Sequence, residues 1–310
     1  MIIFIFRRLG FMVLTMVVVS VVLFMLLEFS PGNVATKVLG PYSSDEQRDL
    51  WLEAHGYFEP LHLRYLSWLG NFASGDLGES IRFKTPVADV LWPRLGNTGL
   101  LGLVTFAIMI PLSLVLGVLS GMREGSPLDR TISIASIVTT SVPEFASAVL
   151  LAAIFVFWLG ILPGTSTMSD GFDFAQLVLP VMVLVLYDFG YVTRMTRASM
   201  AEVMTQPYIR TAVLKGLPYS KVIIRHALRN ALIAPFTVIM LQINWLLSGV
   251  IVVEFFFAYK GFGALLLEAS LNDDIFLIEA CAMVAVFVAV ATQTIADVGY
   301  TFLNPRIRVS

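Results

Sequence analysis

Long apolar stretches separated by short charged segments dominate this chain. A helix needs about 20 apolar residues to cross the hydrocarbon core of a bilayer. Six stretches meet this length, and the third and sixth exceed it, so tilt or extension beyond the lipid is expected for those two. The pattern predicts an all-α membrane protein with six transmembrane helices, over residues 9–27, 95–122, 131–162, 174–193, 231–253 and 275–303.

The first apolar stretch is interpreted as a retained transmembrane helix. It follows Arg7 and Arg8, as the apolar core of a signal peptide would. However, it is longer than the usual core of about 7–15 residues, and no small-x-small cleavage site follows it. The residues around Arg7-Arg8 also fit a twin-arginine signal poorly.

Charge predicts the orientation of these helices. If both termini are cytoplasmic, 13 of the 20 Lys and Arg residues lie in cytoplasmic segments, and six of the remaining seven lie in the long segment 28–97. Short cytoplasmic loops carry the Lys/Arg excess, whereas long external segments translocate largely regardless of charge. We therefore expect both termini inside and an extracytoplasmic insert over 30–97, between the first helix (1–29) and a five-helix core (98–310).

The insert has two features of its own. Ser43-Ser-Asp-Glu46 predicts a helix N-terminus, with a serine cap followed by acids in the first turn. Aromatic residues are common at the headgroup level of a membrane, so their number here indicates that the insert lies on the outer membrane face. These aromatic residues are Trp51, Tyr57, Tyr65, Trp68 and Trp92.

Composition excludes several classes of function. Charged residues make up 14% of the chain, against about 25% in soluble domains. The formal net charge is −2, so nucleic acid is not an expected partner. One cysteine, Cys281, and three scattered histidines offer neither a disulfide nor a metal site. The chain has no G-x-x-x-x-G-K-[ST] sequence, so it cannot hydrolyse ATP through such a loop.

A short basic helix is predicted between the fourth and fifth apolar stretches. Pro207 suits its first turn and Gly216 its C-terminal end. Arg210 and Lys215 flank an apolar face. A helix of about ten residues is marginal alone in water, so it must pack on a lipid surface or on a protein, and the pattern leaves both open. The apolar face consists of Ile209, Ala212, Val213 and Gly216.

Two motifs in this region resemble a known segment. Thr211-Ala-Val-Leu-Lys-Gly216, followed by Arg225-His-Ala-Leu-Arg-Asn-Ala-Leu-Ile233, is similar to the coupling segment of ATP-binding-cassette (ABC) importer permeases. The variant resembles that of the dipeptide/oligopeptide/nickel permease family, in the first of its two permease subunits (dipeptide-permease-B-like). We place the coupling segment at 198–229.

The resemblance extends along the whole chain in the correct order. It covers the first helix and its exit, the outer insert, the approach to the coupling segment and the C-terminal end. The matching stretches are Phe6-Arg-Arg-Leu9, Ser30-Pro-Gly-Asn33, Tyr65-Leu-Ser-Trp-Leu-Gly-Asn71, Gly75-Asp-Leu-Gly-Glu-Ser80, Arg194-Met-Thr-Arg-Ala-Ser-Met200 and Asn304-Pro-Arg-Ile-Arg308.

Two departures from the family pattern stand out. Val213 and Leu214 replace an Arg-Ala pair in the coupling motif, which makes the contact face more apolar. Glu144, in Ser141-Val-Pro-Glu-Phe145, stands where the family more often has a small hydroxyl residue.

The resemblance implies a type I ABC importer permease in a bacterial or archaeal inner membrane, with no enzymatic activity or cofactor of its own. Its implied partners are a second, homologous permease, two ATPase subunits that bind ATP and Mg²⁺, an external solute-binding protein that the insert helps to receive, and membrane lipid. ATPase closure would move the coupling helix and switch pore access. The coupling residues are Tyr208, Arg210, Thr211, Ala212, Val213, Lys215 and Gly216.

Three acids within the apolar stretches are candidates for the solute path. A charge in the bilayer centre costs about 2.5–3.5 kcal/mol on insertion scales. Glu144 follows Pro143, which interrupts the helix, so a kink beside a carboxylate is expected. Glu144 and Asp188 could contact an amine-bearing solute, or be neutral or paired structural groups. For Glu254 a structural or gating role is favoured, and Asp273-Asp274 is interpreted as a solvated loop.

The transported solute stays open on this reasoning. Peptides or peptide-like molecules are expected, with nickel chelates, opines and oligosaccharides as alternatives within the family. A secondary transporter that acts without an ATPase is the main rival, although no internal repeat is visible. An exporter permease has no need of the 30–97 insert, and a membrane enzyme needs a catalytic set that this sequence does not offer.

Overall fold

The computed structural model describes residues 2–29, 34–169 and 171–303. Ser30–Asn33 and the C-terminal stretch 304–310, which contribute to the family resemblance, lie outside the described residues. Within the described part, every extended regular element is a helix, and β-pairing is confined to one isolated bridge between Glu79 and Pro86. The all-α fold class is confirmed.

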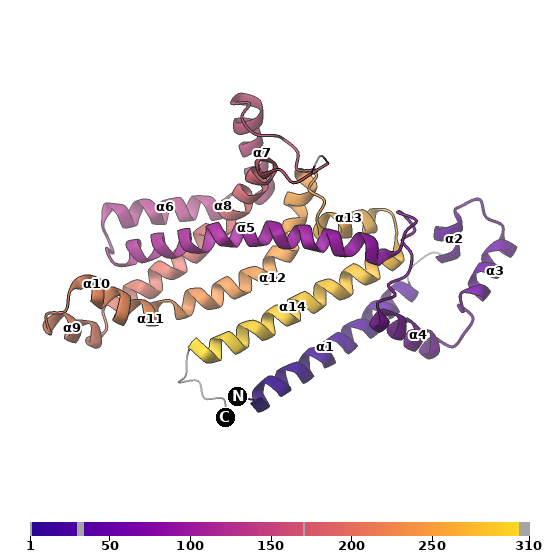
Figure 1. Cartoon of the computed structure of the whole chain (residues 1–310), viewed down its shortest axis with the longest axis horizontal. Helices are drawn as coiled ribbons and strands as arrows, with labels where there is room; N and C mark the ends of the chain where they lie inside the picture. Colours follow the sequence, from indigo (N-terminus) through magenta and orange to yellow (C-terminus); the bar gives the residue numbers. More distant parts are fainter. Residues whose placement is uncertain (1, 30–33, 170, 304–310) are drawn as a thin grey trace. The chain divides into compact units, whose positions relative to one another are not determined.

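Figure 1 shows the long helices of the chain, and these coincide with the apolar stretches of the sequence. In the described residues, four helices are long and apolar enough to cross a membrane, and two bent helix pairs raise the number to six if each pair counts as one span. The four are α1 (Ile2–Glu28), α5 (Val87–Gly121), α8 (Phe174–Met204) and α14 (Ile275–Leu303).

The first bent pair occupies the third apolar stretch. Helix α6 (Pro127–Ser141) is followed after Val142-Pro143 by α7 (Glu144–Ala152) and the π-helix η1 (Ala153–Trp158), at an angle of 100°. Figure 1 shows α7 turning away from the line of α6. Because Pro143 cannot donate a backbone hydrogen bond, the helix stops there, and the kink expected beside Glu144 is confirmed.

The second bent pair leads into the fifth apolar stretch. Residues Tyr219–Ala231 meet the start of α12 (Ile233–Phe256) at 49°. A further short apolar helix, α13 (Phe262–Leu271), connects α12 to α14 and was not predicted. At ten residues it is too short to span a bilayer, so the search for long apolar stretches could not detect it.

Two helices extend further along the chain than the predicted apolar stretches. Helix α8 continues past Thr193 to Met204, and α5 begins at Val87 rather than at residue 95. Apolarity marks only the part of a helix that lies in lipid, whereas a helix continues until a residue breaks it. Pro207 follows the end of α8 and Pro86 precedes the start of α5, positions at which proline is better tolerated than in a helix interior, although α8 also contains Pro180.

The chain divides into two compact units, of which the first contains Met1–Asn97 and Gly261–Ala291. It includes α2 (Val34–Leu39), α3 (Asp45–Ala54) and α4 (Leu61–Ser74). Ser44 caps α3 in a reciprocal capping box with Gln47, which confirms the predicted helix start. The core of this unit is formed by Val87, Leu91, Phe262, Leu265 and Leu277 with their neighbours.

The second unit contains Thr98–Lys260 and the chain from Thr292 onward. Helix α8 is its central element, because it packs against α6, α7, α11 and α12. Its buried residues cover most of the helix surface, and many of them form an apolar core with Leu101, Leu151, Val238 and Val253. The segment after α8 therefore starts from a firmly packed helix.

Candidate functional site

The predicted coupling segment folds into a series of short helices at the end of α8. Helix α9 (Pro207–Leu214) is followed by α10 (Tyr219–Val222), the π-helix η2 (Ile223–Ala227) and α11 (Leu228–Ala231). Pro207 occupies the first turn of α9, and Gly216 has φ +74°. Glycine adopts this left-handed conformation at little cost, so both predicted ends of the helix are confirmed.

The buried face of α9 is narrower than its sequence pattern indicated. Ile209 and Ala212 are buried, whereas Val213 is 51% exposed and Gly216 lies in solvent. The expected four-residue face is therefore wrong for its last two members. Helix α9 ends at Leu214, so the i+7 position does not continue the stripe, and Val213 falls at the edge of the face that Ile209 and Ala212 define.

Helix α9 is anchored by its own apolar cluster. Ile209 and Ala212 pack with Met200 and Val203 of α8, and Val118 and Met122 at the end of α5 pack against the same cluster. A side-chain hydrogen bond from Asn230 Nδ2 to Tyr208 Oη, 3.0 Å long, links α9 to α11. Any force applied to α9 therefore acts directly on the ends of α5 and α8.

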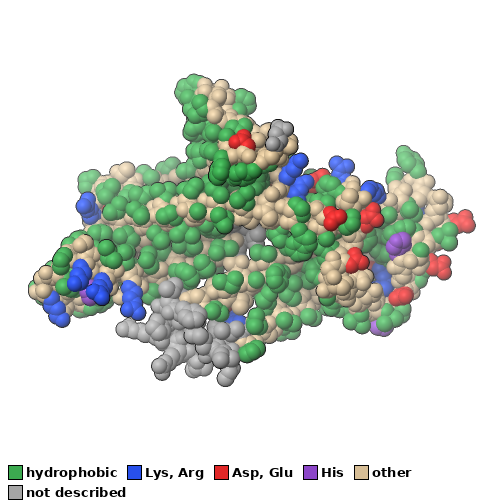
Figure 2. Space-filling view, viewed as in Figure 1, with side chains coloured by type: hydrophobic (Ala, Val, Ile, Leu, Met, Phe, Trp, Pro, Cys, Tyr) green, Lys and Arg blue, Asp and Glu red, His purple; other side chains and the backbone are tan. Residues whose placement is uncertain are grey.

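The outward surface of this segment combines apolar and basic groups. Leu214 is 78% exposed, and Val213 and Tyr208 are also exposed. Figure 2 shows Lys and Arg side chains gathered over the region of α9, α10 and α11. An apolar patch with a charged rim is typical of a protein-binding surface. The exposed basic residues are Arg210, Lys215, Lys221, Arg225 and Arg229.

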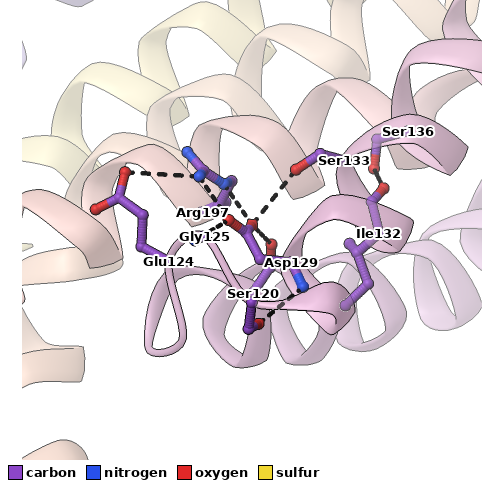
Figure 3. A network of polar contacts seen from close by, with 9 residues as sticks. Ser120, Glu124, Gly125, Asp129, Ile132, Ser133, Ser136 and Arg197 are labelled. Atoms are coloured by element: carbon purple, nitrogen blue, oxygen red, sulfur yellow. Dashed lines mark hydrogen bonds and ion pairs between the residues drawn. The ribbon is translucent and has the colours of Figure 1, made fainter.

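A buried ion pair joins α6 to α8 beside the coupling segment (Figure 3). Arg197 Nε donates to Asp129 Oδ1 at 2.6 Å, and Arg197 Nη2 donates to Asp129 Oδ2 at 2.7 Å. The Ser120 hydroxyl, at 2.5 Å, and the Gly125 backbone amide, at 2.8 Å, also donate to this carboxylate. Paired, bidentate hydrogen bonds of this kind are both strong and directional.

The ion pair sits where α5 and α8 touch backbone to backbone. A Cβ atom added at Gly121 would lie 2.6 Å from the carbonyl oxygen of Arg197, so only glycine permits this approach. The ends of α5, α6 and α8 are thus fixed to one another just before α8 leads into α9. The sequence did not single out Asp129, because an acid beside a loop is expected to be exposed to solvent. Its partner, Arg197, is also 68 positions away along the chain.

Two of the three acids proposed for the solute path lie close together in the interior. Glu144 begins α7 and is 9% exposed, and Asp188 in the middle of α8 is fully buried. The two carboxylates interact electrostatically. Gln242 of α12 donates to Asp188 Oδ1 at 2.6 Å, whereas Glu144 Oε1 and Asp188 Oδ2 have no hydrogen-bond partner among the described residues.

The third acid has a different environment. Glu254, near the end of α12, is fully buried and accepts a hydrogen bond of 2.5 Å from the Thr98 hydroxyl. Its backbone carbonyl accepts from the amide of Tyr259 at 2.8 Å. These contacts tie α12 to α5 and to the turn after α12, as a structural or gating role for Glu254 would require.

The interpretation of Asp273-Asp274 as a solvated loop is wrong for Asp274. Its side chain is fully buried and accepts hydrogen bonds from the Ser80 hydroxyl, at 2.5 Å, and the Arg82 amide, at 3.0 Å. It also caps α14 through the amide of Leu277. Asp274 therefore holds the insert motif Gly75–Ser80 against the start of α14, a pairing 194 residues apart that sequence reasoning could not detect.

These features define a class: an all-helical, multi-pass membrane protein with an exposed basic segment at the end of its central helix. Residues 113–309 match the family described as "Binding-protein-dependent transport system inner membrane component", and residues 1–98 match its N-terminal counterpart. The chain belongs to this family, which confirms the resemblance drawn from its motifs. It is thus a non-catalytic inner-membrane permease component of a binding-protein-dependent transport system.

Curated relatives align over nearly the full chain. The oligopeptide transport system permease protein AppB of Bacillus subtilis is 34% identical over 296 residues, covering 93% of this chain and 94% of that protein. A putative peptide transport system permease protein of Brucella abortus is 33% identical, with 98% of both chains covered. A probable peptide ABC transporter permease protein of Sinorhizobium fredii is 30% identical, with 99% of both covered.

Proposed function

We propose that this chain forms half of the translocation pore of an ABC importer for peptides or peptide-like solutes. The observation that carries the proposal is the exposed segment α9–α11, which is anchored on α8 and presents an apolar patch within a basic rim. The names of the full-length relatives support peptides as the solute class.

The partners follow from this role. Two ATPase subunits bind ATP and Mg²⁺, one of them receives α9 in a surface cleft, and a second homologous permease completes the pore. Both termini of this chain face the cytoplasm, and the insert 30–97 faces outward and helps to receive the solute-binding protein. The exposed Leu214 and Val213 provide the apolar contact, and Arg210 and Lys215 provide the charged rim.

The coupling step is mechanical. Closure of the ATPases on ATP moves α9, and the shared cluster with α8 and α5 carries the movement into the membrane. ATP must therefore bind with different free energy to the inward and outward states, because otherwise it could not drive the switch. Tyr208, Thr211, Ala212 and Gly216 set the shape of the docked segment.

The solute path passes Glu144 and Asp188 in this proposal, with Glu254 as a gating group at the end of α12. Support comes from the Glu144 and Asp188 oxygens, which are buried and have no hydrogen-bond donor among the described residues, because an unsatisfied buried acceptor is costly. An amine-bearing solute could supply that donor when α7 hinges at the Val142-Pro143 break and moves away from α8.

The test is reconstitution of the assembled transporter in liposomes with its binding protein. We expect uptake of a radiolabelled tripeptide that requires both ATP and the binding protein. Leu214→Asp places a charge on the docking patch without touching the buried face, so it should abolish ATP-dependent uptake while the chain stays folded. Uptake that proceeds without ATP, or a Leu214→Asp variant that transports normally, would contradict the proposal.

A further inference from the structure

The first unit contains a cavity whose lining residues belong neither to the coupling segment nor to the proposed solute path. It lies between the end of α1, the turn before α4, α4 itself and the start of α14, and its volume is about 370 Å³. Small-molecule sites in proteins usually occupy roughly 300–1,000 Å³ and combine apolar walls with a few polar groups. The size therefore suits a small solute or one end of a larger one.

Aromatic rings form much of the cavity wall. Phe24, Tyr57, Trp68 and Phe276 all line it, and the rings of Phe24 and Trp68 lie 5.8 Å apart, centroid to centroid. Burial, followed by the charge of Glu279, raises the pKa of Tyr57 to about 12, so its hydroxyl stays neutral at pH 7. Faces of neutral aromatic rings attract cations.

The charges in the wall are predominantly negative. Three carboxylates (Glu28, Glu59 and Glu279) line the cavity together with one guanidinium, Arg64. Arg64 forms a bidentate pair with Glu28, with nitrogen–oxygen distances of 2.5 and 2.6 Å, and its Cζ atom lies 4.3 Å from the centroid of the Tyr57 ring. Among the described residues, Glu59 and Glu279 have no ion-pair partner.

Glu279 is the central group of this wall. It is 8% exposed, and its Oε2 accepts a 2.9 Å hydrogen bond from the indole of Trp68. In the described part of the chain, no hydrogen bond to its other oxygen is present. Glu279 and Trp68 also line an adjoining cavity of about 110 Å³. A carboxylate buried this deeply requires a donor or a cation to offset its desolvation.

We propose that this cavity binds the primary ammonium group of a solute, such as the amino terminus of a peptide, before it enters the pore. The inference deepens the proposed function and rests on it for the outward orientation of the insert. The Glu279 and Glu59 carboxylates pair with the ammonium group, and the aromatic wall contacts the first side chain. An aminophospholipid headgroup fits less well, because its phosphate would meet the same carboxylates.

The test uses the assembled transporter in nanodiscs made without aminophospholipid, in the absence of binding protein and ATP. Saturation-transfer NMR is suited to weak ligands, with trialanine as the probe and N-acetyl-trialanine, which lacks the ammonium group but keeps the carboxylate, as its match. We expect trialanine to bind about tenfold more tightly than the acetylated peptide. This ratio corresponds to about 1.4 kcal/mol of binding free energy lost with the ammonium group. Equal binding of both peptides would overturn the proposal.

Two variants locate the binding. Glu279→Gln keeps an acceptor for Trp68, and Glu59→Gln changes an exposed side chain, so at least one should remain folded. Each should weaken trialanine binding several-fold and leave the acetylated peptide unchanged. Glu268→Gln, in the same unit but outside the cavity wall, is the matched control and should bind as the wild type does. Unchanged binding in both test variants would also overturn the proposal.

A lipid arm completes the design. If phosphatidylethanolamine added to the nanodiscs displaces trialanine, the cavity is a lipid site and the proposal fails; we expect no displacement. Failure of ATP-driven uptake for both peptides would count against the proposed function alone, because the ammonium preference is measured here without transport.

Discussion

Arg197 of α8 and Asp129 of α6 form a bidentate ion pair in which the two partners differ in burial. The Asp129 side chain is 3% exposed and that of Arg197 is 28% exposed. Removing one member of a buried pair is costly because the other charge is left uncompensated. The cost should therefore depend on which member is removed.

Arg197→Gln should destabilise the chain more than Asp129→Asn. The first change strands a carboxylate in the interior, at a cost of about 3–5 kcal/mol, whereas the second leaves a guanidinium that reaches water. Thermal unfolding of the purified chain in mild detergent measures the difference. Arg194→Gln, three residues earlier on α8, is the control: within the described part of the chain its Nε donates to the carbonyl of Gly190 alone, at 3.3 Å, and it should shift the melting temperature little. Equal shifts for all three variants would refute the proposed role of the pair.

Gly216→Val should uncouple ATP hydrolysis from solute movement. A Cβ at this position meets no atom within 4 Å, and the residue has φ +74°, so the change acts through backbone strain of about 1–2 kcal/mol that shifts the end of α9. The readout is the number of solute molecules moved per ATP hydrolysed. Gly75→Val is matched to it, because Gly75 also ends a helix at positive φ with open space around it. We expect the ratio to fall only for Gly216→Val; a normal ratio there would argue against the coupling role.

Glu144→Gln should slow transport of a cationic solute more than that of a neutral one. The substitution preserves size but removes the charge that would face an amine beside Asp188. The measurement is uptake of a lysine-containing and a neutral tripeptide, each expressed relative to wild type so that binding-protein preference cancels. Glu254→Gln, whose carboxylate is already bonded by Thr98, should affect both peptides equally. Equal effects of Glu144→Gln on the two peptides would indicate that Glu144 is structural.

Asp274→Asn should weaken the attachment of the insert to α14. One side-chain oxygen accepts from Ser80 and Arg82, and the other accepts from Leu277, so an amide with a single acceptor cannot keep all three bonds. Hydrogen bonds to a charged group contribute about 1.5–3 kcal/mol, and the melting temperature should drop accordingly. The neighbouring Asp273 is 74% exposed, and Asp273→Asn should have little effect. Similar shifts in the two variants would show that burial of Asp274 does not matter.

The membrane-crossing elements could be predicted because they depend on local composition. The long helices coincide with long apolar stretches, and the break at Pro143 follows from one residue's chemistry. The ends of the coupling helix could also be predicted from local sequence, because Pro207 and Gly216 mark them. Its outward face was predicted less well, because the choice of exposed side depends on the ends of α5 and α8 that pack beneath it.

Tertiary pairings account for what sequence reasoning missed. Asp129 and Asp274 look like loop acids, and only partners far along the chain, Arg197 and Ser80, turn them into buried structural groups. The cavity around Glu279 is likewise assembled from three separate stretches of sequence. Residue type alone therefore identified acids worth attention but could not separate those that hold the fold from those that face a ligand.

The central claim is that α9 and its neighbours attach this chain to an ATPase. The most direct measurement is purification of the tagged chain from its native membrane in mild detergent, followed by mass spectrometry of the accompanying proteins, for wild type and Leu214→Asp. We expect a second permease and nucleotide-binding subunits with the wild type, and loss of the nucleotide-binding subunits alone with the variant. A folded wild-type chain that purifies without any nucleotide-binding subunit would contradict the account and favour a transporter that works without an ATPase.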